Sequence, residues 1–249
     1  MKIILNGACG FMCKEVIKLA NANYQNAQIV GGIDSFSTGN EEIPCVKSFE
    51  EANFKGDCIV DFSHHSLTPA LLDYAIKNNL PLVLCTTGHT KEEKELILNA
   101  SKQIPLFYSA NMSVGVSLLC ELAKKVALTM ENADIEIIEK HHNRKIDAPS
   151  GTALMLFNEI KEVRKDAFSV VGRNGMSKRQ SSNEIGIHSL RMGNVVGEHE
   201  VIVSTPNQTI TLKHEAHNRA LFAEGALTAS AFLVSKPNGL YDMKDMLKN

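Results

Sequence analysis

Residues 136–153 gather side chains that could donate a proton and bind an anion. The stretch reads Glu-Ile-Ile-Glu-Lys-His-His-Asn-Arg-Lys-Ile-Asp-Ala-Pro-Ser-Gly-Thr-Ala. His141 or His142 can donate a proton near neutral pH, and Arg144 and Lys145 add positive charge beside them. A proton donor next to cations favours chemistry on a small acidic molecule.

The end of the same stretch predicts a helix start that would bind a carboxylate. Pro149 disfavours helix before it, and Ser150 is a good N-cap residue. The amides of Gly151, Thr152 and Ala153 would then point toward an anion at the positive end of a helix. Each feature alone is commonly structural, as a cap, packed histidines or a solvated loop. Their joint occurrence favours a substrate site.

A glycine-rich turn near the N-terminus predicts a dinucleotide site. Residues 7–13, Gly-Ala-Cys-Gly-Phe-Met-Cys, follow an apolar run and open a helical pattern, where backbone amides can approach a pyrophosphate. Asp34 ends the second apolar run, and its carboxylate could accept hydrogen bonds from the adenosine ribose. No lysine or arginine occurs within residues 35–40, so we expect NADH to be preferred, with NADPH the alternative.

The elements that must position these residues alternate between strand and helix in the first part of the chain. Short apolar runs predict strands at Lys2–Leu5, Gln28–Ile33, Cys58–Phe62, Leu82–Cys85 and Pro105–Tyr108. Helical spacing predicts helices at Phe11–Ala22, Thr68–Asn78 and Lys91–Lys102. This alternation is typical of an α/β domain with a parallel sheet and right-handed crossovers.

The pattern changes after Asn111. A long apolar helix over Val114–Met130 precedes β-type runs at Ala133–Glu139, Ile185–Arg191, His199–Ser204 and Thr209–His214. We expect a C-terminal α+β domain with an antiparallel or mixed sheet. An alanine-rich helix over Ala220–Val234 would return to the first domain. The predicted domains are 1–112 plus 221–249 for dinucleotide binding and 113–220 for substrate binding.

Composition excludes several classes of function. The formal net charge of −2 gives no excess positive charge for nucleic acid, and no apolar stretch predicts a signal peptide or membrane span. The six cysteines form no CxxC pair, so neither a metal site nor a disulfide framework is predicted. We expect a cytoplasmic protein without metal, nucleic-acid or membrane partners.

The stretch over residues 136–153 also resembles a known family. It is similar to the signature Glu-Ile-x-Glu-x-His-x-x-x-Lys-x-Asp-x-Pro-Ser-Gly-Thr-Ala of the dihydrodipicolinate reductases. Further segments of the chain resemble the same family: Asp61-Phe62-Ser63, Thr86-Thr87-Gly88, residues 110–116, Glu184-Ile185-Gly186, residues 196–199 and residues 239–243. The resemblance therefore extends over nearly the whole chain.

The resemblance implies a Rossmann-like N-terminal domain, a C-terminal substrate and tetramerisation domain with a mixed open sheet, and a homotetramer. It implies NAD(P)H-dependent reduction of 4-hydroxy-tetrahydrodipicolinate in diaminopimelate and lysine biosynthesis. His141 would be the general acid, Lys145 its catalytic cationic partner, and His142, Ser150, Gly151 and Thr152 the substrate contacts. The cofactor contacts would be Gly7, Ala8, Cys9, Gly10, Phe11, Met12, Asp34, Cys85, Thr86, Thr87, Ser109, Ala110, Asn111 and Met112.

Three alternatives stay open at this point. The chain could be another two-domain nicotinamide dehydrogenase, such as one that acts through a cysteine, although Cys85 and Cys120 lie in unsuitable segments. It could be a non-catalytic dinucleotide sensor, which would need no proton donor. A metal site of Glu139, His141 and His142 is the third, but adjacent residues of an extended segment point apart.

Overall fold

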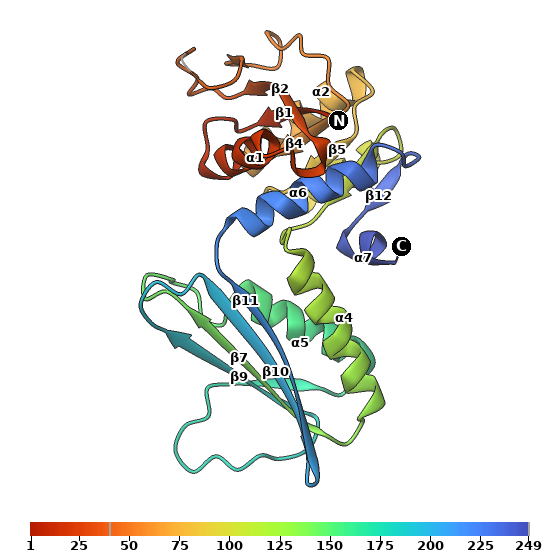
Figure 1. Cartoon of the computed structure of the whole chain (residues 1–249). Helices are drawn as coiled ribbons and strands as arrows, with labels where there is room; N and C mark the ends of the chain where they lie inside the picture. The colour runs from red at the N-terminus through yellow and green to blue at the C-terminus, as the bar shows by residue number, and fades with distance from the viewer. Residues whose placement is uncertain (40, 249) are drawn as a thin grey trace. The chain divides into compact units, whose positions relative to one another are not determined.

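The computed structural model describes residues 1–39 and 41–248. Asn40, in the polar loop after the second predicted strand, and Asn249, at the end of the predicted first domain, lie outside the described residues. Contacts divide the chain into two compact units, both drawn in Figure 1. Unit 1 is Met1–Ser113 with Ala220–Asn249, and unit 2 is Val114–Arg219.

Unit 1 is built on a parallel sheet. Its strands, within the described residues, are β1 (Lys2–Asn6), β2 (Gln28–Ile33), β3 (Cys45–Val46), β4 (Cys58–Asp61), β5 (Leu82–Leu84), β6 (Pro105–Tyr108) and β12 (Gly239–Tyr241). Their order is β12-β6-β5-β4-β1-β2-β3, and each neighbouring pair is parallel. The predicted Rossmann-like parallel sheet is confirmed. The short strands β3 and β12 were not predicted, because two or three residues show no periodicity.

Helices cover both faces of this sheet. They are α1 (Phe11–Asn21), α2 (Thr68–Lys77), α3 (Lys91–Ala100), α6 (Ala220–Leu233) and the short α7 (Met243–Leu247), with 3-10 turns at Tyr24–Asn26 and His65–Leu67. From β1 the strand order runs one way to β2 and the other way through β4, β5 and β6. Right-handed crossovers therefore place α1 on one face and α2 and α3 on the other.

Helix α6 packs beside α1 and against β4, β5 and β6. Helix α6 also lies very close to the segment after β6: a Cβ added at Gly225 would lie 1.7 Å from the Met112 carbonyl oxygen. Only glycine allows this approach of two backbones. The alanine-rich sequence of α6, with Ala223, Ala226 and Ala229 fully buried, suits the same tight packing.

Unit 2 combines a mixed sheet with two helices. Its strands, over the described part of the chain, are β7 (Asp134–His141), β8 (Phe168–Val171), β9 (Glu184–Arg191), β10 (Gly197–Thr205) and β11 (Gln208–Ala216), and its helices are α4 (Val114–Thr129) and α5 (Gly151–Val163). The order is β11-β10-β7-β9-β8. Strand β10 is antiparallel to β7 and β11, while β9 is parallel to β7 and β8, so the predicted mixed sheet is confirmed.

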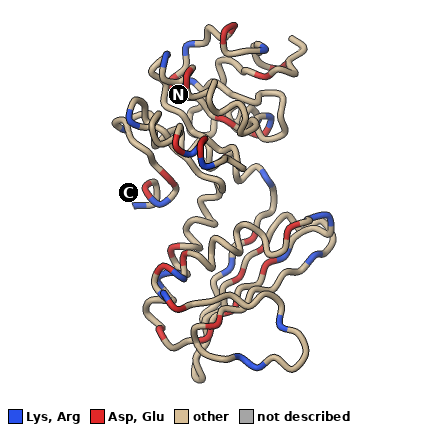
Figure 2. Tube along the Cα trace, turned by 180° about the vertical axis from the view of Figure 1, so that it is seen from behind, with Lys and Arg blue, Asp and Glu red and all other residues tan. Residues whose placement is uncertain are grey.

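Alternation along β7 separates the two faces of this sheet. Ile135 and Ile137 are fully buried in a core with apolar side chains of α4 and α5. Two and four residues further, Glu139 and His141 continue on the same buried face. The intervening residues are only partly buried, and Lys140 pairs there with Glu198 and Glu200. Figure 2 shows acidic and basic residues lying near one another along these strands.

Candidate functional site

A cavity of about 640 Å³ in unit 1 lies at the carboxyl ends of β1, β2 and β4. The chain order of the sheet reverses between β1 and β4, which is where open α/β sheets bind nucleotides. The cavity is lined by the predicted residues Gly7, Cys9, Gly10 and Asp34, and also by Asn6, Phe36, Lys47, Phe62, Ser63, His64 and Leu67.

The glycine turn has the geometry that a dinucleotide requires. Gly7 has φ +79°, and an added Cβ would lie 2.8 Å from the Phe62 carbonyl oxygen, so the position requires glycine. Helix α1 starts directly after the turn, and Lys14 N donates a helical hydrogen bond to the Gly10 carbonyl oxygen. The amides of the first helical residues, including Phe11 and Met12, therefore have no partner within the helix and can bind an anion.

Cys13 stands where the dinucleotide pattern usually has its last glycine, and burial accommodates it. Cys13 is fully buried, and its Sγ lies 3.6 Å from the Asn6 carbonyl oxygen of β1. Ala8 is also buried, whereas Phe11 is 57% exposed at the start of α1. Cysteine is thus small enough for the close helix–sheet contact that the last glycine of the pattern usually provides.

Asp34 follows β2 and is held by the backbone. Its Oδ2 accepts a hydrogen bond from Cys9 N, and its Oδ1 accepts one from Phe36 N, both at 2.9 Å. The carboxylate thus joins the glycine turn to the loop after β2. Each oxygen keeps a lone pair that could accept a ribose hydroxyl.

The remaining predicted cofactor residues lie at the same edge of the sheet. Cys85, Thr86 and Thr87 follow β5, and the segment Ser109–Met112 follows β6. Cys85, Thr86 and Met112 are buried, whereas Thr87 and Ala110 are exposed. Within the second segment, Ser109 Oγ donates to the Asn111 carbonyl oxygen at 2.7 Å. The carboxyl ends of β1, β2, β5 and β6 thus bring all the predicted cofactor residues to one edge.

A buried carboxylate that sequence reasoning missed connects these strand ends. Asp61, at the end of β4, is fully buried and accepts hydrogen bonds from Asn6 Nδ2 at 2.7 Å, Ser63 Oγ at 2.6 Å and Thr86 Oγ1 at 2.5 Å. Burial raises the pKa of Asp61, and these hydrogen bonds oppose the increase. The network connects the carboxyl ends of β1, β4 and β5, and two of its members, Asn6 and Ser63, line the predicted cofactor cavity.

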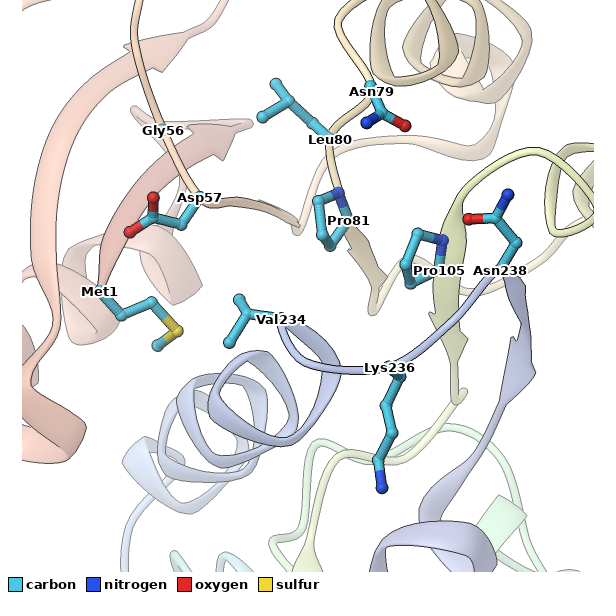
Figure 3. A pocket seen from close by; sticks show the side chains of 10 residues that line it. All are labelled: Met1, Gly56, Asp57, Asn79, Leu80, Pro81, Pro105, Val234, Lys236 and Asn238. Atoms are coloured by element: carbon cyan, nitrogen blue, oxygen red, sulfur yellow. The ribbon is translucent and has the colours of Figure 1, made fainter.

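A second cavity in unit 1, of about 690 Å³, lies at the amino ends of the strands (Figure 3). It is lined by Met1, Asp57, Pro81 and Pro105, which immediately precede strands or begin one. In Figure 3 the Lys236 side chain points away from the others, and its Nζ lies 4.3 Å from the centre of the Phe232 ring. Because nucleotides bind at carboxyl ends of parallel strands, the first cavity is the candidate cofactor site.

In unit 2 the predicted proton donor is bound to a buried carboxylate. Glu139 is fully buried, and its Oε2 lies 2.5 Å from His141 Nδ1. Arg191 donates to both carboxylate oxygens at 2.8 Å, and Ser150 N donates to Oε1 at 3.1 Å. Burial raises the pKa of Glu139, but its hydrogen bonds with Arg191 and His141 outweigh it and lower the pKa to about 2.

An ionised Glu139 defines which nitrogen of His141 can act. A carboxylate only accepts hydrogen bonds, so Nδ1 must donate and Nε2 remains for proton transfer. Gly197 lies beside that nitrogen, since a Cβ added there would come within 3.2 Å of Nε2. Glycine at this position therefore leaves space next to Nε2.

The predicted helix start forms as expected. Ser150 is the N-cap of α5 and accepts a hydrogen bond from Ala153 N at 3.2 Å. Its Oγ also lies 3.1 Å from Nε2 of the buried His199. Gly151 is exposed and Thr152 is partly buried in the first turn. Glu139 thus connects the predicted acid His141 with the predicted anion-binding helix start.

The other predicted residues of this loop lie outside that network. Lys145 Nζ pairs with Asp147 Oδ1 at 2.9 Å, and Lys145 N donates to the His142 carbonyl oxygen. The His142 side chain is partly buried, and its Nδ1 has no hydrogen-bond partner among the residues that the structure describes. Burial lowers the pKa of His142, and the neighbouring Arg144 and Arg219 lower it further. His142 is therefore a neutral group near physiological pH, which suits a contact better than proton donation.

Neither of two chemical alternatives finds support in the side chains. The described residues hold no cluster of three or more His, Cys, Asp or Glu side chains that could bind a metal. Cys85 and Cys120 are buried free thiols, and burial raises the pKa of Cys85 well above its ordinary value. A buried protonated thiol is a poor nucleophile.

Sequence reasoning missed Arg191, His199 and Lys47, and it weighed Glu139 only as a metal ligand. Arg191 comes from β9, 52 residues after Glu139, and His199 comes from β10, 49 residues after Ser150. The one local signal was the alternation that places Glu139 and His141 on the same face of a strand.

These features define a class of protein: a dinucleotide-binding oxidoreductase with a second α+β unit that carries the hydrogen-bonded Glu139–His141 pair and the helix start at Ser150. Comparisons identify the family. The model for the N-terminus of dihydrodipicolinate reductase matches residues 1–112, and the model for its C-terminus matches residues 115–247. This chain belongs to the dihydrodipicolinate reductase family, so the resemblance seen in the sequence is confirmed.

Individual relatives agree over the full length. A 4-hydroxy-tetrahydrodipicolinate reductase of Clostridium novyi (strain NT) is 47% identical, with 100% of this chain and 98% of the relative covered. One of Caldanaerobacter subterraneus subsp. tengcongensis is 43% identical with the same coverage. A solved dipicolinate-bound dihydrodipicolinate reductase from Paenisporosarcina sp. TG-14 has TM-score 0.81 and 25% identity, covering 97% of each chain.

Proposed function

We propose that this chain catalyses the NAD(P)H-dependent reduction of 4-hydroxy-tetrahydrodipicolinate to tetrahydrodipicolinate in diaminopimelate and lysine biosynthesis. The observation that carries the proposal is the hydrogen bonding of Glu139 to both His141 Nδ1 and Ser150 N. One buried carboxylate thereby positions a proton donor and a helix start that suits a carboxylate. Relatives named for this activity support the same conclusion.

The residues of unit 2 divide the work on a dicarboxylate substrate. The positive end of α5, at Gly151 and Thr152, binds a carboxylate, and His142 contacts the substrate. Lys145, now paired with Asp147, exchanges that partner for substrate and stabilises its charge. Once the substrate has lost its 4-hydroxyl group as water to give a conjugated imine, hydride adds at ring carbon four and His141 delivers a proton from Nε2 to the electron-rich neighbouring carbon.

The cofactor supplies the hydride. The glycine turn suits the pyrophosphate, and Asp34 suits the adenosine ribose. The Asp61 network holds Thr86 in the loop after β5, which is also predicted to contact NAD(P)H. Asp34 favours NADH, because its carboxylate accepts from ribose hydroxyls and repels a 2′-phosphate.

A coupled assay tests this function. Dihydrodipicolinate synthase would generate the unstable substrate, and loss of nicotinamide absorbance would report its reduction with NADH or NADPH. We expect His141→Ala and Lys145→Ala each to lower kcat/KM by about two orders of magnitude or more, the usual size of general-acid and electrostatic contributions. Lys161→Ala, an exposed lysine of α5, is the matched control. Near wild-type turnover in both variants would refute these roles.

We further propose a cytoplasmic homotetramer. The six cysteines are free thiols, which suits a reducing compartment. The face of the unit 2 sheet that carries Ile138 and Ile202 is not the one packed on α4 and α5, and it suits pairing with other copies. Separately, the described residues contain no helix long and apolar enough to cross a membrane. Light scattering on the purified protein would give four times the chain mass of 27.3 kDa if the proposal is right.

A further inference from the structure

Strands β2 and β3 bring a lysine close to Asp34. This lysine follows β3 and does not belong to the loop after β2. Ile33 and Val46 are partners in the parallel pair, and Asp34 N donates to the Val46 carbonyl oxygen at 2.9 Å. The next residue after Val46 is Lys47. Asp34 and Lys47 therefore follow the carboxyl ends of neighbouring strands, at the same edge of the sheet. Both line the cavity of about 640 Å³.

The negative charge of Asp34 is partly compensated by the backbone. Both of its oxygens already accept amide hydrogen bonds, from Cys9 N and Phe36 N. Hydrogen bonds to a carboxylate disperse its charge and so weaken its repulsion of a second anion. Asp34 alone therefore does not close the cavity to a ribose that carries a phosphate.

Lys47 supplies an available positive charge at the same place. Its side chain is exposed, and no carboxylate of the described residues forms an ion pair with its Nζ. Its own amide donates to Glu51 Oε2 at 3.2 Å, which anchors the backbone at this position. Ser35 and Ser48 also line the cavity; the Ser48 hydroxyl donates to the Glu50 carboxylate, whereas Ser35 provides a hydroxyl donor.

Two further acidic residues place negative charge near this cavity. Glu50 lines it, and Glu41 lies in the loop after β2. The Glu41 carboxylate is occupied by Thr38 N at 2.6 Å, Gly39 N at 3.0 Å and Ser37 Oγ at 3.0 Å, and these hydrogen bonds, led by that of Thr38, lower its pKa to about 2. Glu41 is thus held by its own loop and does not pair with Lys47.

We propose that Lys47 is a specificity-determining residue that binds the adenosine 2′-phosphate of NADPH, so that this chain uses NADPH as well as NADH. The inference rests on the proposed function of the cavity and deepens it. A phosphate dianion next to an exposed ammonium and the Ser35 hydroxyl gains charge-assisted hydrogen bonds that the ribose hydroxyl of NADH does not form.

Direct binding to the full-length protein without substrate tests this role. Dissociation constants for NADH and NADPH would be measured by calorimetry for the wild-type protein and for Lys47→Gln, Lys47→Arg and Lys77→Gln. Lys77 is an exposed lysine of α2 that does not line the cavity. We expect Lys47→Gln to weaken NADPH binding by up to about fivefold, the upper range for a solvent-exposed ion pair, and to leave NADH binding unchanged. Lys47→Arg should keep most of the affinity for NADPH.

Salt provides a second readout. Raising the potassium chloride concentration should weaken NADPH binding to the wild-type protein more than to Lys47→Gln, because the lost interaction is between exposed charges. Equal binding of NADPH by both proteins, at every salt concentration, would overturn the role of Lys47 and leave the proposed reductase function intact. Failure of the wild-type protein to bind either dinucleotide would overturn both.

Discussion

Glu139 Oε2 accepts a hydrogen bond from His141 Nδ1 at 2.5 Å, on the buried face of the strand that both residues share. The same carboxylate is held by both terminal nitrogens of Arg191. His141 therefore cannot rotate or change tautomer without breaking a charge-assisted hydrogen bond. The proposed acid is positioned before any ligand binds.

Replacing Glu139 by Gln should slow catalysis with little effect on cofactor binding. The amide leaves the Arg191 guanidinium without its anionic partner and lets the His141 ring turn. We expect kcat to fall roughly 10- to 100-fold, a part of the usual general-acid contribution. The NADH dissociation constant should stay unchanged, because the cofactor cavity belongs to unit 1. Glu200→Gln, on the other face of the unit 2 sheet, is the control, and a kcat near wild type for Glu139→Gln would contradict the positioning role.

His199 should make the protein lose stability in mild acid. Burial, together with the nearby His141, lowers the pKa of His199 to about 4. Between about pH 6.5 and 4 the unfolded chain binds a proton that the folded chain does not, so the free energy of unfolding falls as the pH drops, by about 3 kcal/mol at most. Urea midpoints at pH 7 and pH 5 should differ less for His199→Gln than for wild type. The exposed His217→Gln should retain the wild-type difference.

Phe36 should contribute to the binding of both cofactors alike. It is 85% exposed and lines the cavity that also contains Asp34. An exposed aromatic ring beside a ribose site can stack on adenine, which is worth about 1–3 kcal/mol per base in other proteins. Phe36→Ala should therefore raise the dissociation constants for NADH and NADPH, measured by calorimetry, by the same factor. A selective loss of one cofactor would show that Phe36 contacts the ribose substituent instead.

Gly225→Ala should destabilise unit 1. The new methyl group would lie 1.7 Å from the Met112 carbonyl oxygen, so two backbone segments must separate. Overpacking of this kind costs about 1–3 kcal/mol, with more where backbone must move. A lower urea midpoint would show the effect, whereas Glu224→Ala, at the exposed neighbouring position of α6, should change it little. Unchanged unfolding of Gly225→Ala would mean that α6 can shift without cost.

Much of the fold follows from local pattern. Apolar runs predicted β2 at Gln28–Ile33 and β6 at Pro105–Tyr108 with the bounds that the structure has. The glycine turn and the Ser150 cap were recognisable because a few adjacent residues specify each one. The helix over Thr68–Asn78 was predicted one residue too long, as helix ends often are.

The parts that were missed depend on residues distant in sequence. Lys47 reaches the cofactor cavity through the two-residue strand β3, whereas the search for a basic residue covered only residues 35–40. Arg191 and His199 join Glu139 and Ser150 through strand pairing, which leaves no local spacing to detect. The role of Asp61 likewise depends on three strand ends meeting.

Unit 1 is discontinuous, because helix α6 and strand β12 are made only after the whole of unit 2. During synthesis on the ribosome, the strands from β1 to β6 are therefore made before α6, and the face that α6 later covers stays exposed to water until then. Unit 2 is a continuous segment and can complete its own contacts earlier. A nascent chain stalled before Ala220 should accordingly recruit chaperones through its N-terminal segment, and release of the rest should end that dependence.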